Sequence, residues 1–152
     1  MSDLELRDEP YDGPIAQQLI SAVQAEYVVR YGGPDDTPVD PVEFAPPNGL
    51  FLVGYLDAEP VAMGGLRRHE DGEVEIKRMY VVPDARGKGL SRVMLGALED
   101  RARGLGATRV VLETGQRQPE AISLYESSGY ERIPGFGHYA DAPLSVSFEK
   151  KL

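Results

Sequence analysis

The chain has 152 residues, of which 41% are hydrophobic and 27% charged, so it is long and apolar enough for one domain with a single core and is not disordered. It contains no cysteine, which excludes disulfides, thiolate metal sites and a cysteine nucleophile. The net charge is −9, yet residues 77–109 carry 8 basic and 3 acidic side chains. We therefore expect a site for a small polyanion and no nonspecific binding of nucleic acid.

The first residues, MSDLELRDEP, are acidic and lack the positive region and apolar run of a signal peptide. No apolar run in the chain approaches the ~20 residues that a membrane span needs. We therefore expect a cytoplasmic protein with no membrane partner, and a single domain over residues 1–152.

The N-terminal third predicts a strand, a helix and a long loop. Residues 4–8 alternate in polarity as a strand does, and apolar residues recur at helical spacing over residues 15–31. Residues 31–49 are rich in proline, glycine and aspartate, which leave room for no more than a short helical turn. A loop of this length inside a compact domain is often functional.

The rest of the chain predicts strands and helices in mixed order. The expected elements are an antiparallel meander of strands at 50–56, 60–68 and 73–81, a helix at 89–105, a strand at 109–114, a helix at 119–129 and a final strand at 145–150. The strand–helix–strand unit in the middle predicts one parallel pairing. The fold class is therefore α+β, with a mixed, mostly antiparallel central sheet and helices on both faces.

The third strand of the meander, EVEIKRMYV, contains a phase slip. Val74 and Ile76 share one face, so a period of two places Arg78 on that face as well. The apolar pattern instead resumes at Met79 and Val81, one residue out of phase. Such a slip is typical of a β-bulge, which leaves backbone N–H and C=O groups free for a ligand. The alternative is that the Arg78 side chain simply snorkels at a sheet edge.

The turn after this strand, PDARGKG, leads directly into a helix. Gly87 and Gly89 permit positive φ and carry no Cβ, so backbone amides at the helix N-terminus can converge on an anion. Arg86, Lys88 and Arg92 add positive charge. The pattern is neither the P-loop GxxxxGK[ST] nor the dinucleotide fingerprint GxGxxG. It fits R-x-x-G-x-small, and a diphosphate is the expected ligand.

The segment RMYVVPDARGKGLSRVMLGALEDRARGLG, followed by RVVLETG and AISLYESSGY, resembles the GNAT superfamily of acyl-CoA-dependent N-acyltransferases. The resemblance covers roughly residues 49–152. It combines the R/Q-x-x-G-x-G/A motif with the A-x-x-L-Y-x-x-x-G-[YF] motif at residues 121–130. It implies a GNAT-like fold and a site for acetyl-CoA as cosubstrate.

The resemblance also implies which residues bind the cosubstrate. They are Met79, Tyr80, Val81, Arg86, Gly87, Lys88, Gly89, Leu90, Ser91, Gln118 and Tyr125. Two positions depart from the family: Ser91 stands where Gly or Ala is usual, and Gln118 stands where many members have Asn. Since the amide at position 91 remains and serine is small, we expect binding to persist.

Acyl transfer to an amine requires a neutral amine, a stabilised oxyanion and an accommodated thiolate. The resemblance implies that Tyr125 protonates the sulfur, while a backbone N–H of Tyr80 or Val81 would bind the oxyanion. For the base, Glu75 on the bulged strand is our first choice and Glu113 is its rival. Without a cysteine, direct attack in a ternary complex is the simplest route.

The acceptor is expected to be a small-molecule or peptide amine. Asp35, Asp36 and Asp40 in the long loop favour a cationic acceptor, and a Gly-rich loop with His138 and Tyr139 is a candidate wall of its pocket. With isolated histidines, no metal site is expected. A monomer and a homodimer are both compatible. The alternative functions are a non-catalytic acyl-CoA-binding or sensing module and a protein-interaction domain whose basic residues meet an acidic partner.

Overall fold

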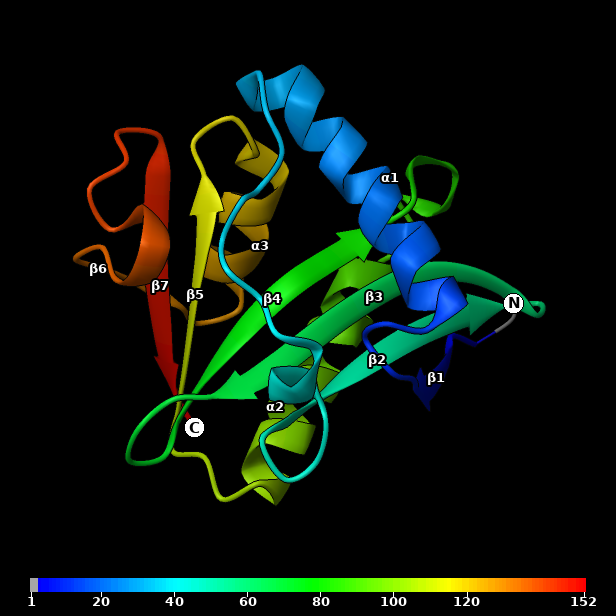
Figure 1. The fold of residues 1–152 in the computed structure, drawn as a ribbon, viewed down its shortest axis with the longest axis horizontal. Helices are drawn as coiled ribbons and strands as arrows, with labels where there is room; N and C mark the ends of the chain where they lie inside the picture. The colour runs from blue at the N-terminus through cyan, green and yellow to red at the C-terminus, as the bar shows by residue number, and fades with distance from the viewer. Residues whose placement is uncertain (1–2) are drawn as a thin grey trace.

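The computed structural model describes residues 3–152 and contains a seven-stranded mixed sheet with helices on both faces (Figure 1). The strand order is β1-β2-β3-β4-β5-β7-β6, and β4 with β5 is the parallel pair within it. The helices and strands are β1 (Glu5–Asp8), α1 (Pro14–Tyr31), β2 (Gly49–Leu56), β3 (Glu59–Arg68), β4 (Glu73–Val81), α2 (Leu90–Gly104), β5 (Arg109–Gly115), α3 (Pro119–Ser127), β6 (Glu131–Ile133) and β7 (Ser145–Lys151). The fold class predicted from the sequence is confirmed.

The predicted elements agree with the structure to within two residues at each end. Short 3₁₀ turns at Pro41–Phe44, Pro83–Ala85 and Gly137–Tyr139 lie in the connections. β6, a three-residue edge strand that pairs with β7, is not among the elements delimited from the sequence. So short a strand shows too few alternations to be recognised.

The sheet separates two hydrophobic clusters. On one face, α1 packs through residues such as Leu19 and Val23 against Phe51 and Met63 of the sheet. On the other face lie α2 and α3, with the larger cluster that includes Met94. The single long helix α1 therefore stands opposite α2 and α3, and Figure 1 shows the sheet between them.

The bulge predicted in β4 is confirmed. Lys77 pairs with Gly65 and Tyr80 pairs with Met63, so Arg78 and Met79 together face Gly64 alone. Arg78 has a φ of 60°, a left-handed conformation that is uncommon for a residue with a side chain. The bulge interrupts the pairing at Arg78 and Met79, and β4 pairs with β3 again at Tyr80 and Val81.

The two parallel strands separate soon after they begin. Their pairing runs only from Glu73–Glu75 opposite Arg109–Val111, and the remainder of each strand is unpaired with the other. Parallel strands present their carboxyl ends at one edge, and ligand sites of α/β sheets often lie where neighbouring strands diverge. The separation creates the space in which the predicted site residues meet.

Candidate active site

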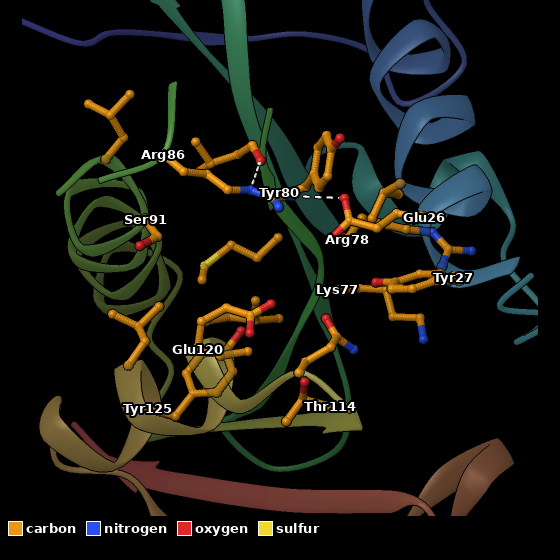
Figure 2. Close-up of a pocket in the computed structure, with 18 of the residues that line it drawn as sticks. Glu26, Tyr27, Lys77, Arg78, Tyr80, Arg86, Ser91, Thr114, Glu120 and Tyr125 are labelled. Carbon is orange, nitrogen blue, oxygen red and sulfur yellow. Dashed lines mark hydrogen bonds and ion pairs between the residues drawn. The ribbon is translucent and has the colours of Figure 1, made fainter. Parts of the chain in front are cut away.

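The main cleft is a cavity of about 280 Å³ between β4, the glycine turn, α1 and α3 (Figure 2). Figure 2 shows Ser91 and Tyr125 on one side of it and Tyr27 and Lys77 on the other. Every cosubstrate-binding residue predicted from the sequence lines this cleft except Lys88, which is exposed beside it. The structure therefore brings together residues that are up to 46 positions apart, from Met79 to Tyr125.

The glycine turn has the geometry of an anion-binding site. Gly87 and Gly89 have φ values of 80° and 75°, and Gly89 is the N-cap of α2 with no side chain capping the helix. Within residues 3–152, the amides of residues 87–89 donate to no backbone acceptor. A Cβ built on either glycine would meet no atom within 4 Å, so the space around the turn is open. Uncapped amides at a helix N-terminus favour an anion.

Two of the three basic side chains near the turn have protein partners. Arg86 donates from Nε to the Val81 carbonyl at 2.9 Å and from Nη2 to Glu26 at 2.8 Å. Arg92 donates to the hydroxyls of Ser127 and Ser128, which connects the start of α2 to the end of α3. Among residues 3–152, the backbone amides and the exposed Lys88 are thus the groups without a partner at the turn.

The bulge is held by a buried ion-pair cluster. Arg78 is 7% exposed, which excludes the alternative of a snorkelling side chain. Its guanidinium pairs with Asp35 of the loop after α1, and Asp35 also lies 3.1 Å from the Lys77 ammonium. Burial alone would raise the pKa of Asp35, but the charges of Lys77 and Arg78 outweigh it and hold that pKa well below its usual range.

Replacing Asp35 with asparagine is expected to destabilise the protein by about 3 kcal/mol, because two buried cations would lose their shared anion. Urea unfolding of Asp35→Asn measures the loss, and Asp84→Asn on the surface is the control. Since the pKa of Asp35 is depressed on folding, the stabilisation is present above the unfolded-state pKa of about 4 and declines as the pH falls further. A difference that persists undiminished at pH 2 would contradict this account.

The Tyr125 side chain lies in the wall of the main cleft. Its ring packs on Tyr130 and Phe148 at centroid distances of 5.6 and 5.8 Å, and it lines the main cleft. Within the described part of the chain its hydroxyl has no hydrogen-bond partner. Burial raises its pKa, so the phenol stays protonated and able to donate.

The two carboxylates considered as bases occupy different environments. Glu75 is 2% exposed and lies 2.9 Å from both Arg67 Nε and His69 Nε2. Burial would raise its pKa, but His69 and Arg67 lower it overall, and Glu75 lines neither the main cleft nor the adjoining pocket described below. Our first choice of base is therefore not supported, because these two partners hold Glu75 away from the cavity.

Glu113, the rival candidate, lies at the end of β5 and lines the main cleft. Its Oε2 atom is enclosed and accepts no hydrogen bond from residues 3–152. Burial raises the pKa of Glu113 above its ordinary value, and the lowering effect of nearby Lys77 does not cancel it. A carboxylate with a raised pKa and no fixed partner is the better proton acceptor.

A second cavity of about 400 Å³, here called the side pocket, adjoins the main cleft. The loop after α1, the end of β5 and residues 139–145 form its walls. Tyr139 lines it as predicted, whereas His138 does not line it and instead contacts Asp36 at 2.9 Å. Tyr139 also donates to Asp36, so the two loops are joined across the outer wall.

The three loop aspartates all have protein partners, which corrects their predicted role. Asp35 belongs to the ion-pair cluster, and the Asp36 carboxylate accepts a hydrogen bond from the Tyr139 hydroxyl. Asp40 caps the 3₁₀ turn by accepting from the Val42 amide at 3.1 Å. The loop therefore provides structure at this site rather than a set of unpaired carboxylates for a cation.

Residues 3–152 contain no group of three or more His, Asp or Glu side chains arranged to hold a metal ion. Of the helices in the described range, none combines the length and apolar character needed to cross a membrane.

The bulged strand, the uncapped glycine turn and the cleft between diverging parallel strands are the features expected from the resemblance to acyl-CoA-dependent acyltransferases. The chain belongs to the GNAT acetyltransferase family: the model described as "Acetyltransferase (GNAT) family" matches residues 17–130.

Individual relatives agree with this assignment. The chain is 34% identical over 147 residues to an IAA acetyltransferase of Azospirillum brasilense, covering 96% of this chain and 95% of that protein. A crystal structure from Klebsiella pneumoniae, named as an acyl-CoA N-acyltransferase, has a TM-score of 0.83 and 31% identity over 98% of this chain and 97% of its own. The PaiA N-acetyltransferase of Thermoplasma acidophilum, solved with coenzyme A, shares the fold with a TM-score of 0.76 at 15% identity, covering 99% of both chains.

Proposed function

We propose that this protein transfers the acetyl group of acetyl-CoA to a primary amine by direct attack in a ternary complex. The observation that carries the proposal is that a proton donor, Tyr125, and a proton acceptor, Glu113, line the same cleft as the glycine turn. Family membership supports the acetyl donor, and the absence of cysteine from the sequence excludes a cysteine acyl-enzyme.

The residues at the turn fit the diphosphate of CoA. Amides of residues 87–91 at the N-terminus of α2 would hold the negative charge, since the glycines leave the turn open. The edge of β4 that faces β5 is unpaired beyond Glu75, and at Met79 to Val81 this edge would pair with the pantetheine arm, with Gln118 near that arm. When bound, acetyl-CoA supplies the activated acetyl group.

The chain's own groups handle the protons of the reaction. Glu113 takes a proton from the ammonium, directly or through a water, and the amine nitrogen then forms its bond to the acetyl carbon. A backbone N–H of Tyr80 or Val81 stabilises the oxyanion, and the carbon–sulfur bond breaks as Tyr125 donates its proton to the sulfur. The attacking nitrogen loses its second proton as the intermediate collapses, and this proton restores the phenol of Tyr125 through water. The products are an N-acetyl amine and CoA.

A thermal-shift and turnover screen tests the proposal. CoA at 100 times its Kd should stabilise the folded protein by about 2.7 kcal/mol, and acetyl-CoA with a panel of amines should give acetylated product. Stabilisation without turnover on any amine would favour a non-catalytic acyl-CoA-binding module. The absence of stabilisation would contradict the cosubstrate site itself.

Replacing Glu113 with glutamine is expected to lower kcat/KM by about 10²-fold, because the amide cannot accept the proton. Since the pKa of Glu113 is raised, wild-type activity should fall as the pH drops through that pKa, and the variant should lose this limb of the profile. Rates of acetyl transfer from pH 5 to 9 measure both effects, with the exposed Glu131→Gln as control. An unchanged acidic limb would remove Glu113 from the reaction.

A further inference from the structure

The main cleft and the side pocket meet at a junction that contains one cation, Lys77, and two carboxylates, Asp35 and Glu113, of which Asp35 is already paired with Lys77. Lys77 and Glu113 line both spaces, next to Tyr27 and Thr114. If the acetyl donor lies in the main cleft, the attacking amine must lie at this junction, so the inference rests on the proposed function. The donors and acceptors without hydrogen-bond partners at this junction indicate which chemical groups the amine substrate carries.

The Lys77 ammonium has one donor to spare. An ammonium carries three N–H donors, and Nζ lies 3.1 Å from Asp35 Oδ2 and 3.1 Å from Thr37 Oγ1. Among residues 3–152 it has no third hydrogen-bond acceptor. The side chain is 7% exposed, so water has little access to complete its coordination. A ligand atom that accepts a hydrogen bond would do so.

Two buried cations on this side of the junction share one ion-pair partner. Lys77 and Arg78 both pair with the carboxylate of Asp35, and the remaining contact of Arg78 is the neutral hydroxyl of Tyr11. Glu75 and Glu113 act on Lys77 electrostatically, but among residues 3–152 neither forms an ion pair or a hydrogen bond with it. A negative group of a ligand would therefore meet a free donor on Lys77.

Among the described residues, Glu113 lacks a hydrogen-bond donor, just as Lys77 lacks a third hydrogen-bond acceptor. Its enclosed Oε2 has no donor in the described chain, and desolvation by burial is the main cause of its raised pKa. An ammonium group next to it would supply both a donor and a positive charge. The junction thus has an unused donor on Lys77 and an unused acceptor on Glu113.

We propose that the acceptor is a free α-amino acid, with its carboxylate at Lys77 and its amine at Glu113. The two charges of an α-amino acid lie on neighbouring carbons, which suits two complementary groups at one junction. Beyond the junction, rings and aliphatic chains such as Tyr31, Pro143 and Leu144 line the side pocket together with the polar residues Asp36 and Ser145, and the apolar part of this lining suits an apolar side chain. A polyamine would need a second unpaired carboxylate, and Asp36 at the rim is already engaged by Tyr139.

Matched amines test the acceptor. Leucine and 3-methylbutylamine differ only by the carboxylate, as do phenylalanine and 2-phenylethylamine. At equal concentrations of neutral amine, kcat/KM for each amino acid should exceed that of its partner by about tenfold to a hundredfold, the typical effect of a hydrogen bond to a charged group. Putrescine and a lysine peptide with blocked ends represent polyamines and proteins.

Variants of Lys77 separate recognition from catalysis. Lys77→Met should bring the ratio of leucine to 3-methylbutylamine close to one, Lys77→Arg should restore part of it, and the exposed Lys151→Met should leave it unchanged. Calorimetric titration of leucine into the protein saturated with CoA gives a readout that does not depend on turnover. We expect binding that Lys77→Met weakens by at least about tenfold.

The outcomes distinguish the two proposals. Preferred turnover of putrescine, the lysine peptide or the decarboxylated amines would overturn the amino-acid acceptor and leave acetyl transfer intact. Lys77-dependent binding of leucine without turnover of any amine would support the amino-acid site and overturn the transfer reaction. If leucine and phenylalanine neither bind nor react, the amino-acid acceptor is wrong.

Discussion

Replacing Gly89 with glutamate is expected to abolish CoA binding while the protein remains folded. Gly89 is the N-cap of α2 with a φ of 75°, and a side chain there would project into the open space at the turn. A carboxylate at that point would occupy the amides and repel the diphosphate. Isothermal titration with CoA measures the loss, and circular dichroism checks the fold.

The control for this substitution is Gly89→Ala. Alanine imposes a similar backbone strain, about 1 kcal/mol for a left-handed residue with a Cβ, but adds no charge and meets no atom within 4 Å. We expect Gly89→Ala to bind CoA less tightly by no more than about tenfold. If Gly89→Glu binds CoA as the wild type does, the turn is not the diphosphate site.

Replacing Tyr125 with phenylalanine is expected to lower kcat by about 10²- to 10⁴-fold with little change in CoA affinity. The hydroxyl has no protein partner among residues 3–152, so its removal breaks no hydrogen bond and should not destabilise the fold. Because burial raises its pKa, wild-type kcat should not decline at alkaline pH until well above the ordinary tyrosine range. Single-turnover kinetics with acetyl-CoA measure the chemical step.

Tyr130→Phe is the matched control, because its ring lies 5.6 Å from that of Tyr125 while its hydroxyl donates to Glu99 at 2.8 Å. Loss of that buried hydrogen bond should reduce stability by about 1–3 kcal/mol and leave kcat largely intact. Should Tyr125→Phe turn over at the wild-type rate, the leaving thiolate must be accommodated by another group.

Some local features of the structure could be predicted from the sequence because they depend on residues that are close together in the chain. The phase slip around Arg78 shows directly in the alternation of EVEIKRMYV, since side chains of a strand alternate whatever it pairs with. The turn at Gly87 and Gly89 could be predicted for a similar reason, because a backbone with positive φ favours glycine. The role of Tyr125 came from the family resemblance, as its helical spacing alone would suggest a core residue.

The choice between Glu75 and Glu113 could not be made from the sequence. Both are glutamates on strands. They differ in the side chains that surround them and in their access to the cleft, and both of these depend on how the strands are arranged in the sheet. Arg67 and His69 reach Glu75 because β3 and β4 pair as a hairpin, whereas Glu113 meets the cleft because β5 diverges from β4. A pKa follows from such neighbours and from burial.

The sequence by itself determined the order of strands and helices, the bulge, the glycine turn and the family to which the chain belongs. The tertiary structure alone decided that Asp35 of the long loop balances Arg78 and Lys77, and that the unused donor of Lys77 lies at the same junction as the unpaired oxygen of Glu113. The physical reason is that backbone conformation responds to neighbours along the chain, whereas charge balance and hydrogen-bond satisfaction depend on groups that only folding brings together.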